Sequence, residues 1–200
     1  MHIYILNGTA ASGKDLFASN VCTLCGAHGK ILSTIDPIKE AATIAGWNGE
    51  KDEESRRNLN RLKNFFTGWL DTSFNYIERE VRRFEDFIET YQGNVEDIVI
   101  FIMCREPNEI RRLKEAYNAK TVLIRRAEAE DHRWNNPADD DVLLYDYDIE
   151  IHNNGTLYSF ALKAHDFCIT EGIKFCDRAL NGFKISEKGQ IYFEERKEEK

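Results

Sequence analysis

Seven residues near the N-terminus have the types and spacing of a loop that binds phosphate. They read Gly8-Thr9-Ala10-Ala11-Ser12-Gly13-Lys14, after the apolar run Ile3–Leu6 and before a helical pattern of apolar residues. Glycines let successive backbone N–H groups turn toward an anion, and a helix N-terminus adds a favourable dipole. Lysine at this position bridges the β- and γ-phosphates of a nucleotide. The segment predicts an ATP-binding loop; the alternative is a plain strand–turn–helix connection.

Asp15 stands where the common form of this loop has a serine or threonine whose hydroxyl binds Mg²⁺. A carboxylate is also a hard oxygen ligand that Mg²⁺ accepts, and it suits the first turn of a helix. We therefore predict that Asp15 contacts Mg²⁺ directly or through water. Alternatively, Asp15 only stabilises the helix dipole and faces away from the nucleotide.

Further stretches of the chain resemble a known family. The Gly-x-x-x-x-Gly-Lys-Asp turn of residues 8–15, with Ser-Thr-Ile-Asp-Pro-Ile-Lys-Glu-Ala-Ala at 33–42, resembles the nucleoside monophosphate kinase superfamily. The resemblance continues at residues 51–57, 101–110 and 145–156. It is closest to the phage-type deoxynucleoside monophosphate kinases and their bacterial adenylate-kinase-like relatives. Animal phosphomevalonate kinases are similar at the Gly-Lys-Asp turn, which leaves open an acceptor that is not a nucleotide.

The resemblance implies roles for arginines that follow two predicted strands. Arg105 would grip the phosphate of the acceptor, a task that suits a bidentate guanidinium. Its alternative is a salt bridge to Glu106 or Asp36. Arg125 and Arg126 would belong to a lid that closes over ATP and the transferred phosphoryl group, and one of them could instead stack on adenine.

The same polar segment contains two further residues that we considered for the lid. Arg133 is a third arginine candidate within it. His132 is interpreted as a solvated residue of the lid rather than a catalytic base, because phosphoryl transfer needs little proton abstraction.

Acceptor binding is expected on the helices that follow the second predicted strand, where this superfamily binds its acceptor. Asp36 would orient the sugar or base, or simply cap the helix, and Lys39 would contact the phosphate. Arg56 and Arg57 begin another helix of this region, where one would reach the acceptor phosphate or both would lie on a solvated face.

Short apolar runs alternate with helical patterns along the chain, which predicts a P-loop α/β/α fold with a five-stranded parallel sheet. The predicted strands are Ile3–Leu6, Ile31–Ile35, Ile98–Met103, Thr121–Ile124 and Tyr147–Ile151. Ligands of such sheets bind at the carboxyl ends of the strands. Backbone atoms of Asn154, Gly155 and Thr156 would therefore border the donor base, in addition to forming a turn and a helix start.

We predict a kinase domain over residues 1–172. It carries a helical acceptor-binding insertion at about 37–95, with amphipathic helices at about 56–91, and a polar lid loop at about 125–142. An extension, residues 173–200, follows, with a hairpin around Glu187-Lys188-Gly189 and a frayed end. Asp36-Pro37 is expected to begin a helix with Asp36 as its N-cap.

Composition excludes several classes of protein. In the 200-residue chain, 27 Lys and Arg against 35 Asp and Glu give a net charge of −8, which argues against nucleic-acid binding. The sequence has no apolar run of about 18 residues, which argues against a membrane span. Five cysteines without framework spacing and an N-terminus without a basic leader predict a cytoplasmic protein. Cys22-x-x-Cys25 is interpreted as two helix thiols rather than half of a zinc or redox site.

The predicted activity is transfer of a phosphoryl group from ATP, with Mg²⁺, to a nucleoside or deoxynucleoside monophosphate. GTPase motifs such as Asn-Lys-x-Asp are missing, and the apolar strand before Cys104 does not end in the acidic residue of a motor ATPase. Two alternatives stay open: a kinase for another phosphorylated small metabolite, and a nucleotide-binding domain without catalysis. The oligomeric state is not predicted.

Overall fold

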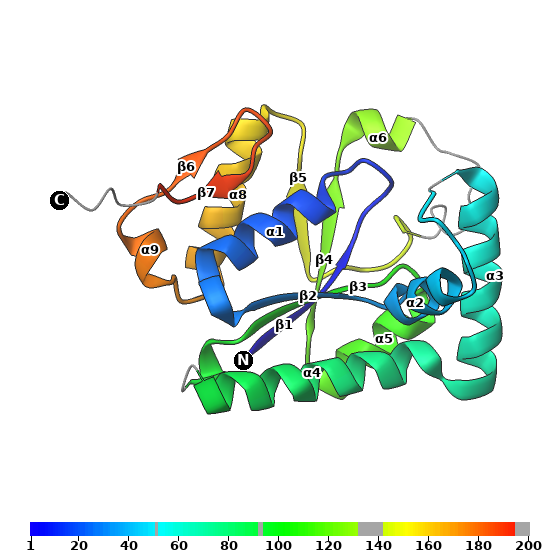
Figure 1. The fold of residues 1–200 in the computed structure, drawn as a ribbon. Coiled ribbons are helices and arrows are strands. Elements are labelled where there is room, and N and C mark those ends of the chain that lie inside the picture. The colour runs from blue at the N-terminus through cyan, green and yellow to red at the C-terminus, as the bar shows by residue number, and fades with distance from the viewer. Residues whose placement is uncertain (51, 92–93, 132–141, 195–200) are drawn as a thin grey trace.

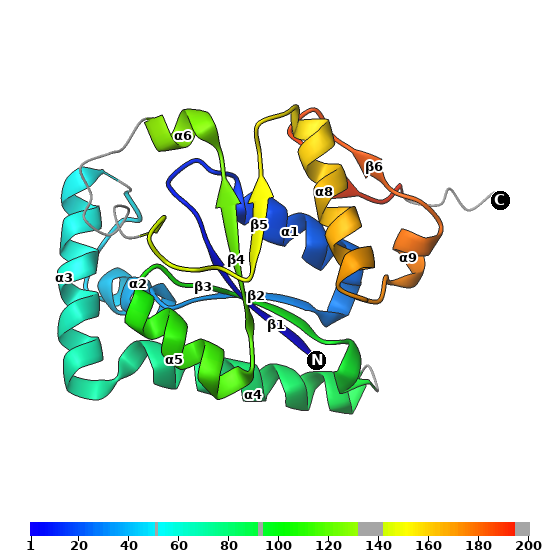
Figure 2. The same cartoon turned by 180° about the vertical axis from the view of Figure 1, so that it is seen from behind.

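The computed structural model of the protein describes residues 1–50, 52–91, 94–131 and 142–194 (Figures 1 and 2). Its larger sheet has five parallel strands in the order β2-β3-β1-β4-β5. The strands are β1 (His2–Asn7), β2 (Gly29–Ser33), β3 (Val99–Met103), β4 (Lys120–Arg125) and β5 (Ile149–His152). The predicted fold class is confirmed, and β1, which leads into the glycine-rich loop, lies in the centre of the sheet.

Helices cover both faces of this sheet, because successive residues of each strand point to opposite sides. On β1, Tyr4 and Leu6 pack with α1 (Lys14–Cys25) and α8 (Leu157–Thr170). Ile3 and Ile5 point to the other face, where they pack with α4 (Thr72–Tyr91) and α5 (Pro107–Tyr117). Short 3₁₀ turns occupy Gly26–His28 and Val95–Asp97. The result is a three-layer α/β/α arrangement.

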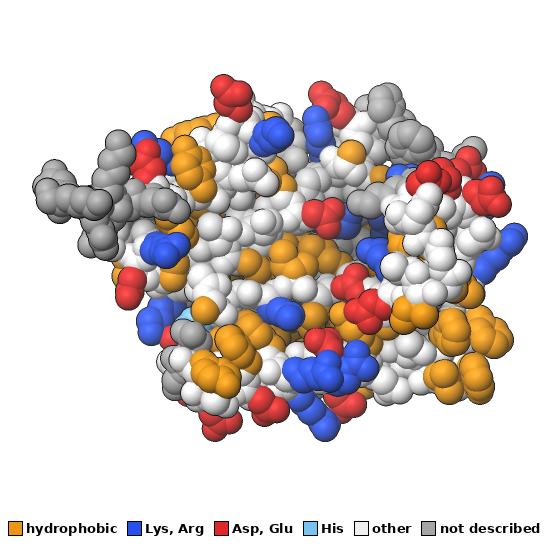
Figure 3. Space-filling model, in the orientation of Figure 1, with side chains coloured by type: hydrophobic (Ala, Val, Ile, Leu, Met, Phe, Trp, Pro, Cys, Tyr) orange, Lys and Arg blue, Asp and Glu red, His pale blue; other side chains and the backbone are white. Residues whose placement is uncertain are grey.

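Two further helices, α2 (Asp36–Ile44) and α3 (Glu53–Leu70), form what we call the helical arm. Figure 1 shows α3 at one end of the molecule. The sequence predicted amphipathic helices from about residue 56, but α3 begins at Glu53 because the Asp52 carboxylate accepts the Ser55 N–H at 2.7 Å and caps the helix. Apolar side chains gather on the surface at this end (Figure 3), among them Trp69, which is 67% exposed.

The predicted lid loop begins differently from the expectation. Ala127–Asp131 form a short helix, α6, where a polar loop was predicted, because alanine and glutamate favour helix even in a charged segment. Residues 132–141 of the predicted lid, including Arg133 and His132, lie outside the described residues.

The C-terminal segment packs beside α1. It contains α9 (Asp177–Leu180) and the antiparallel strands β6 (Lys184–Ile185) and β7 (Ile191–Tyr192), where the sequence predicted a hairpin. Asn20, buried on α1, donates to the Gly189 carbonyl at 2.8 Å and accepts the Ile191 N–H at 2.9 Å. The hairpin is therefore fixed to the helix that follows the glycine-rich loop.

All five cysteines lie within the described ranges and are free thiols. Cys22 and Cys25 both lie on α1, and burial raises the pKa of Cys22 to about 12, so this thiol stays protonated near neutral pH. In the described part of the chain, no helix has both the length and the apolar character that a membrane span requires.

Candidate phosphate-binding site

The predicted strand, loop and helix are present around residues 8–14. The loop leaves the carboxyl end of β1 and turns through Ala11, whose φ of 61° is left-handed, while the Ser12 N–H donates to the Thr9 carbonyl at 3.2 Å. Gly13 then caps α1 with a φ of 97°, a conformation that other L residues rarely adopt. The chain thus turns tightly onto the N-terminus of a helix in the centre of the sheet.

Both glycines of the motif lie against other elements. A Cβ on Gly8 would lie 2.8 Å from the Ile124 carbonyl oxygen, and one on Gly13 would lie 2.6 Å from Asn153 Nδ2 and 3.0 Å from Phe160 Cε1. A side chain at either position would collide with β4 or with the start of α8. The spacing of the two glycines therefore reflects close packing of the loop as well as its conformation.

The loop presents polar groups that its own surroundings do not satisfy. Within the described residues, the buried hydroxyls of Thr9 and Ser12 have no hydrogen-bond partner. The N–H groups of Ala10, Ala11 and Gly13 have no acceptor there. Buried donors without partners cost free energy, which an anion with several oxygens would recover. These groups fit a phosphate.

Lys14 and Asp15 begin α1 beside this loop. The Lys14 side chain is only 14% exposed, and its Nζ lies 3.6 Å from Asp15 Oδ2. The Asp15 carboxylate is 82% exposed, so it is accessible to a metal ion as one oxygen ligand. Asp15 therefore keeps both of its predicted interpretations.

Asn7 holds the loop at its beginning and was not identified from the sequence. Its side chain is fully buried; Oδ1 accepts the Gly8 N–H at 2.8 Å and Nδ2 donates to the Tyr147 hydroxyl at 2.7 Å. A longer contact of 3.5 Å joins Nδ2 to the Arg105 carbonyl oxygen. The one signal in the sequence was a polar residue directly after a buried apolar strand.

Asn153 holds the other end of the loop and was also missed. Its Nδ2 donates to the Ser12 carbonyl at 2.9 Å, and its N–H donates to the Arg125 carbonyl at 2.6 Å. The side chain is buried after β5, so it joins the loop to the ends of β4 and β5. The two asparagines fix the loop without using its own N–H groups beyond Gly8.

Arg105 follows β3 as predicted and is partly buried at the same edge as the loop. The two carboxylates named as its alternative partners are held by other groups. Glu106 Oε2 accepts from Lys63 Nζ at 2.5 Å, and Asp36 Oδ2 accepts the Ser33 N–H at 2.9 Å. Both carboxylates are thus engaged with groups other than the Arg105 side chain.

Lys63, on α3, is buried and paired with carboxylates, and the sequence analysis did not identify it. Its Nζ also donates to Glu109 Oε2 at 2.7 Å and to Thr34 Oγ1 at 3.1 Å. Burial disfavours its charge, but Glu106 and Glu109 outweigh this and raise the pKa of Lys63. Burial likewise opposes ionisation of Glu106, yet the Lys63 ammonium lowers the pKa of that carboxyl below its usual value. The pKa of Glu109 is raised, chiefly by burial.

Cys104 completes this group of side chains. Its Sγ lies 3.6 Å from Glu109 Oε2 and 3.9 Å from Glu106 Oε2. The thiol and the two carboxylates are close enough together to hold a metal ion, but the Lys63 ammonium already lies between the carboxylates. Burial raises the pKa of Cys104 well above its usual value. We therefore interpret the cluster as an ion-paired lysine.

Arg125 and Arg126 lie at the end of β4 and are paired with acidic residues. Arg125 donates to Glu130 at 2.8 and 2.9 Å, and Arg126 donates to Glu128 at 2.6 Å. The hydrogen bonds that Arg125 donates to Glu130 raise the pKa of Arg125 further above its usual value. Both arginines lie where the fourth predicted strand ends, and their guanidinium groups are bound to carboxylates of α6.

The predicted acceptor residues are spread over the helical arm. The prediction of Asp36 as the N-cap is wrong: Ile35 occupies that position, and Asp36 instead bonds backwards to the end of β2. Lys39 Nζ lies 3.6 Å from Asp36 Oδ1. Arg56 and Arg57 lie on the exposed side of α3, where Arg57 pairs with Glu53 at 3.0 Å.

Residues 154–156 form the turn and helix start that the sequence indicated. Asn154 Oδ1 accepts the Ala127 N–H at 2.9 Å, which joins this turn to the start of α6. Thr156 caps α8 through its hydroxyl, which accepts the Ser159 N–H at 3.1 Å. Gly155 lies between them, close to Ser159. This turn therefore lies beside the root of the predicted lid.

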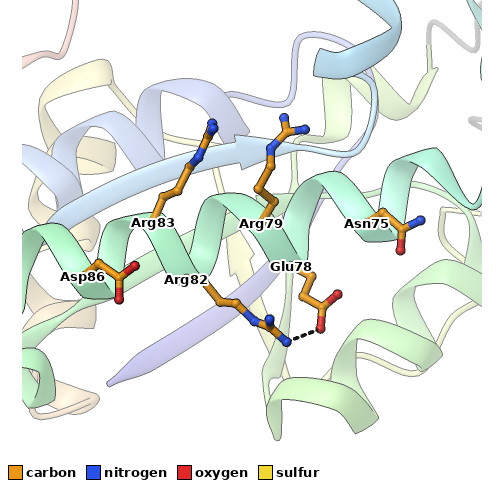
Figure 4. Close-up of a pocket in the computed structure, with 6 residues that line it drawn as sticks. All are labelled: Asn75, Glu78, Arg79, Arg82, Arg83 and Asp86. Atoms are coloured by element: carbon orange, nitrogen blue, oxygen red, sulfur yellow. Dashed lines mark hydrogen bonds and ion pairs between the residues drawn. The ribbon is translucent and has the colours of Figure 1, made fainter.

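A shallow depression of about 240 Å³ lies on α4, away from the strand ends (Figure 4). Its lining residues are Asn75, Glu78, Arg79, Arg82, Arg83 and Asp86. Arg82 pairs with Glu78 at 2.7 Å, whereas Arg79 and Arg83 point to the other side of the helix, over β2. The arginines pair with acidic residues of the same helix, so the depression is not a candidate catalytic site.

Comparison with known proteins gives the fold and no more. No family model matches the chain, and no curated protein matches it. Among solved structures, the chain is similar to TT1252 from Thermus thermophilus, with 14% sequence identity and a TM-score of 0.50. The match covers 86% of this chain and 98% of TT1252. At this identity the similarity concerns the fold alone.

Proposed function

We propose that the protein is an ATP-dependent kinase that converts a nucleoside or deoxynucleoside monophosphate to the diphosphate. The observation that carries this proposal is the loop of residues 8–14, which joins the central strand to α1 and offers buried hydroxyls and N–H groups to an anion. A nucleoside triphosphate supplies the matching oxygens. The resemblance to nucleoside monophosphate kinases in the same residues supports ATP as the donor.

The donor is held by groups of the loop and of α1. The N–H groups of the loop bind phosphate oxygens, and the Lys14 ammonium offsets their charge. Asp15 provides one carboxylate oxygen for Mg²⁺, which in such sites takes its other ligands from phosphates and water. When bound, Mg²⁺ neutralises charge on the phosphates. The Asn154–Thr156 turn lies beside the root of the lid and borders the donor base.

The acceptor phosphate is bound by Arg105, next to the loop. Asp36 and Lys39, with Arg56 or Arg57, contact the remainder of the acceptor. A phosphate oxygen of the acceptor forms a bond to the γ-phosphorus as the bond to ADP breaks. Arg125 and Arg126 stabilise the charge that spreads over the transferred group. No side chain has to remove a proton, because the attacking oxygen is already ionised.

Release of ADP measured across a panel of monophosphates and other phosphorylated small metabolites tests this proposal. We expect turnover with at least one nucleotide acceptor. We also expect Lys14→Ala to lower this turnover about 100-fold or more, while its free energy of unfolding stays that of the wild type. Lys174→Ala is the matched control, because Lys174 is an exposed lysine paired with Asp97. Turnover only with a non-nucleotide acceptor, or ATP binding without any turnover, would contradict the proposal.

A further inference from the structure

The side chain of Tyr147 reaches the carboxyl edge of the sheet, although the residue itself precedes β5. Its hydroxyl accepts a hydrogen bond from Asn7 Nδ2 at 2.7 Å, and the same Nδ2 lies 3.5 Å from the Arg105 carbonyl oxygen. Asn7 ends β1, and Arg105 lies shortly after β3. The Tyr147 hydroxyl therefore lies where the carboxyl ends of two adjacent strands meet, one amide group away from Gly8 at the start of the phosphate-binding loop.

The hydrogen bonds around Asn7 leave the proton of the Tyr147 hydroxyl available to a ligand. Asn7 Oδ1 accepts the Gly8 N–H at 2.8 Å, and because an N–H needs an oxygen as its acceptor, the Asn7 amide has one possible orientation. Its Nδ2 then donates to Tyr147, so the phenolic oxygen accepts and its own proton points elsewhere. Within the described residues, that proton has no acceptor. Burial raises the pKa of Tyr147, so the hydroxyl keeps this proton near neutral pH.

Tyr147 lies on the face of the sheet that carries the helical arm. Asn7 alternates in β1 with Ile3 and Ile5, which point to the face covered by α4 and α5. The ring centroid of Tyr147 lies 5.0 Å from that of Tyr145, which packs against the same apolar cluster. The two helices of the arm, α2 and α3, pack against α4. The available proton of Tyr147 is therefore on the side where the acceptor is proposed to bind, rather than on the side of α1.

We propose that Tyr147 is a substrate-binding residue whose hydroxyl donates a hydrogen bond to a phosphate oxygen of the acceptor. This inference rests on the proposed function, which places the acceptor at this edge of the sheet. A hydrogen bond to a charged oxygen is stronger than one between neutral groups. In this acidic protein the cationic side chains of Lys63, Arg125 and Arg126 are paired with carboxylates. A neutral hydroxyl has no such partner to give up before it binds phosphate.

A purely structural role of the Tyr147 hydroxyl predicts a different result. If the hydroxyl only holds Asn7, its loss loosens the amide that binds Gly8, and ATP binding weakens at least as much as acceptor binding. If the hydroxyl donates to the acceptor, the loss falls on the acceptor alone, because Asn7 keeps its bond to the Gly8 N–H. The loss is then also the same for every base, because the phosphate is common to all monophosphates.

The experiment compares wild type with Tyr147→Phe, which removes the hydroxyl and keeps the ring that contacts Tyr145. Calorimetry measures binding of a non-hydrolysable ATP analogue with Mg²⁺. It then measures binding of the common nucleoside and deoxynucleoside monophosphates to protein saturated with that analogue. We expect Tyr147→Phe to weaken every monophosphate that wild type binds about tenfold, with its affinity for the analogue unchanged. Tyr145→Phe is the matched control, which loses a neighbouring hydroxyl and should bind both ligands as wild type does.

Three results for Tyr147→Phe would overturn the inference: wild-type affinity for the monophosphates, an equal loss of affinity for the ATP analogue, or a loss that differs from base to base. Any of these in a protein whose wild type transfers phosphate leaves the proposed function standing. The reverse outcome is a wild type that binds monophosphates through Tyr147 but transfers nothing, which contradicts the proposed function and keeps the role of Tyr147. Wild type that binds no monophosphate contradicts both.

Discussion

Replacement of Gly13 by alanine tests whether close packing determines the shape of the loop. The left-handed φ of 97° costs alanine about 1–2 kcal/mol. The added Cβ lies 2.6 Å from Asn153 Nδ2 and 3.0 Å from Phe160 Cε1, and such overpacking costs about 1–3 kcal/mol more. We therefore expect Gly13→Ala to lower the free energy of unfolding by about 2–5 kcal/mol, measured by urea denaturation.

Gly46→Ala is the matched control for this substitution. Gly46 has a φ of 103°, but a Cβ there meets nothing within 4 Å, so only the backbone cost of about 1–2 kcal/mol remains. Because Asn153 also bonds to the Ser12 carbonyl, its displacement should distort the loop and weaken MgATP binding in Gly13→Ala alone. Equal unfolding free energies and equal MgATP affinities for the two variants would refute the packing argument.

Two further predictions concern Arg105, which follows β3, and Asp148, which directly precedes β5. Arg105→Ala should raise the KM for the acceptor far more than that for ATP, and equal increases in both would rule out its assigned role. Asp148 accepts from Lys114 and Thr121, and these bonds outweigh burial and lower its pKa. Its stabilisation is therefore present above the unfolded pKa of about 3.9 and is lost as pH falls through the folded pKa. Asp148→Asn should cost about 1 kcal/mol at pH 7 and reduce the acid dependence of stability, as denaturation at pH 7 and pH 3 would show.

Much of the fold could be predicted from local patterns in the sequence. The uniformly apolar run that became β3 is buried throughout, as expected for a strand covered on both faces. Pro107 begins α5 because its missing N–H has no partner to lose in the first turn. The glycine-lysine spacing located the loop because its conformation depends on a few neighbouring residues. Such features need no knowledge of distant contacts.

Features that depend on distant partners could not be predicted. Asn153 lies 141 residues from Ser12, and Lys63 lies 43 residues from Glu106, so no periodicity or spacing relates the members of either pair. For Asp36, by contrast, a local pattern was present but predicted the wrong role. Asp-Pro at a helix start indicates that the aspartate is the N-cap. Here the Asp36 carboxylate instead accepts the Ser33 N–H at the end of β2, so Ile35 is the N-cap and the helix begins at Asp36, one residue earlier than expected.

The basic groups at the carboxyl edge fall into two physical classes. Lys63 is buried, so separating it from Glu106 and Glu109 would leave uncompensated charges and cost several kcal/mol. Arg125 and Arg126 are 35% and 40% exposed, and pairs of this kind contribute little to stability because water screens them. Under the proposed function, a triphosphate would displace Glu130 and Glu128 from the two arginines at small cost, whereas Lys63 would stay paired with Glu106 and Glu109.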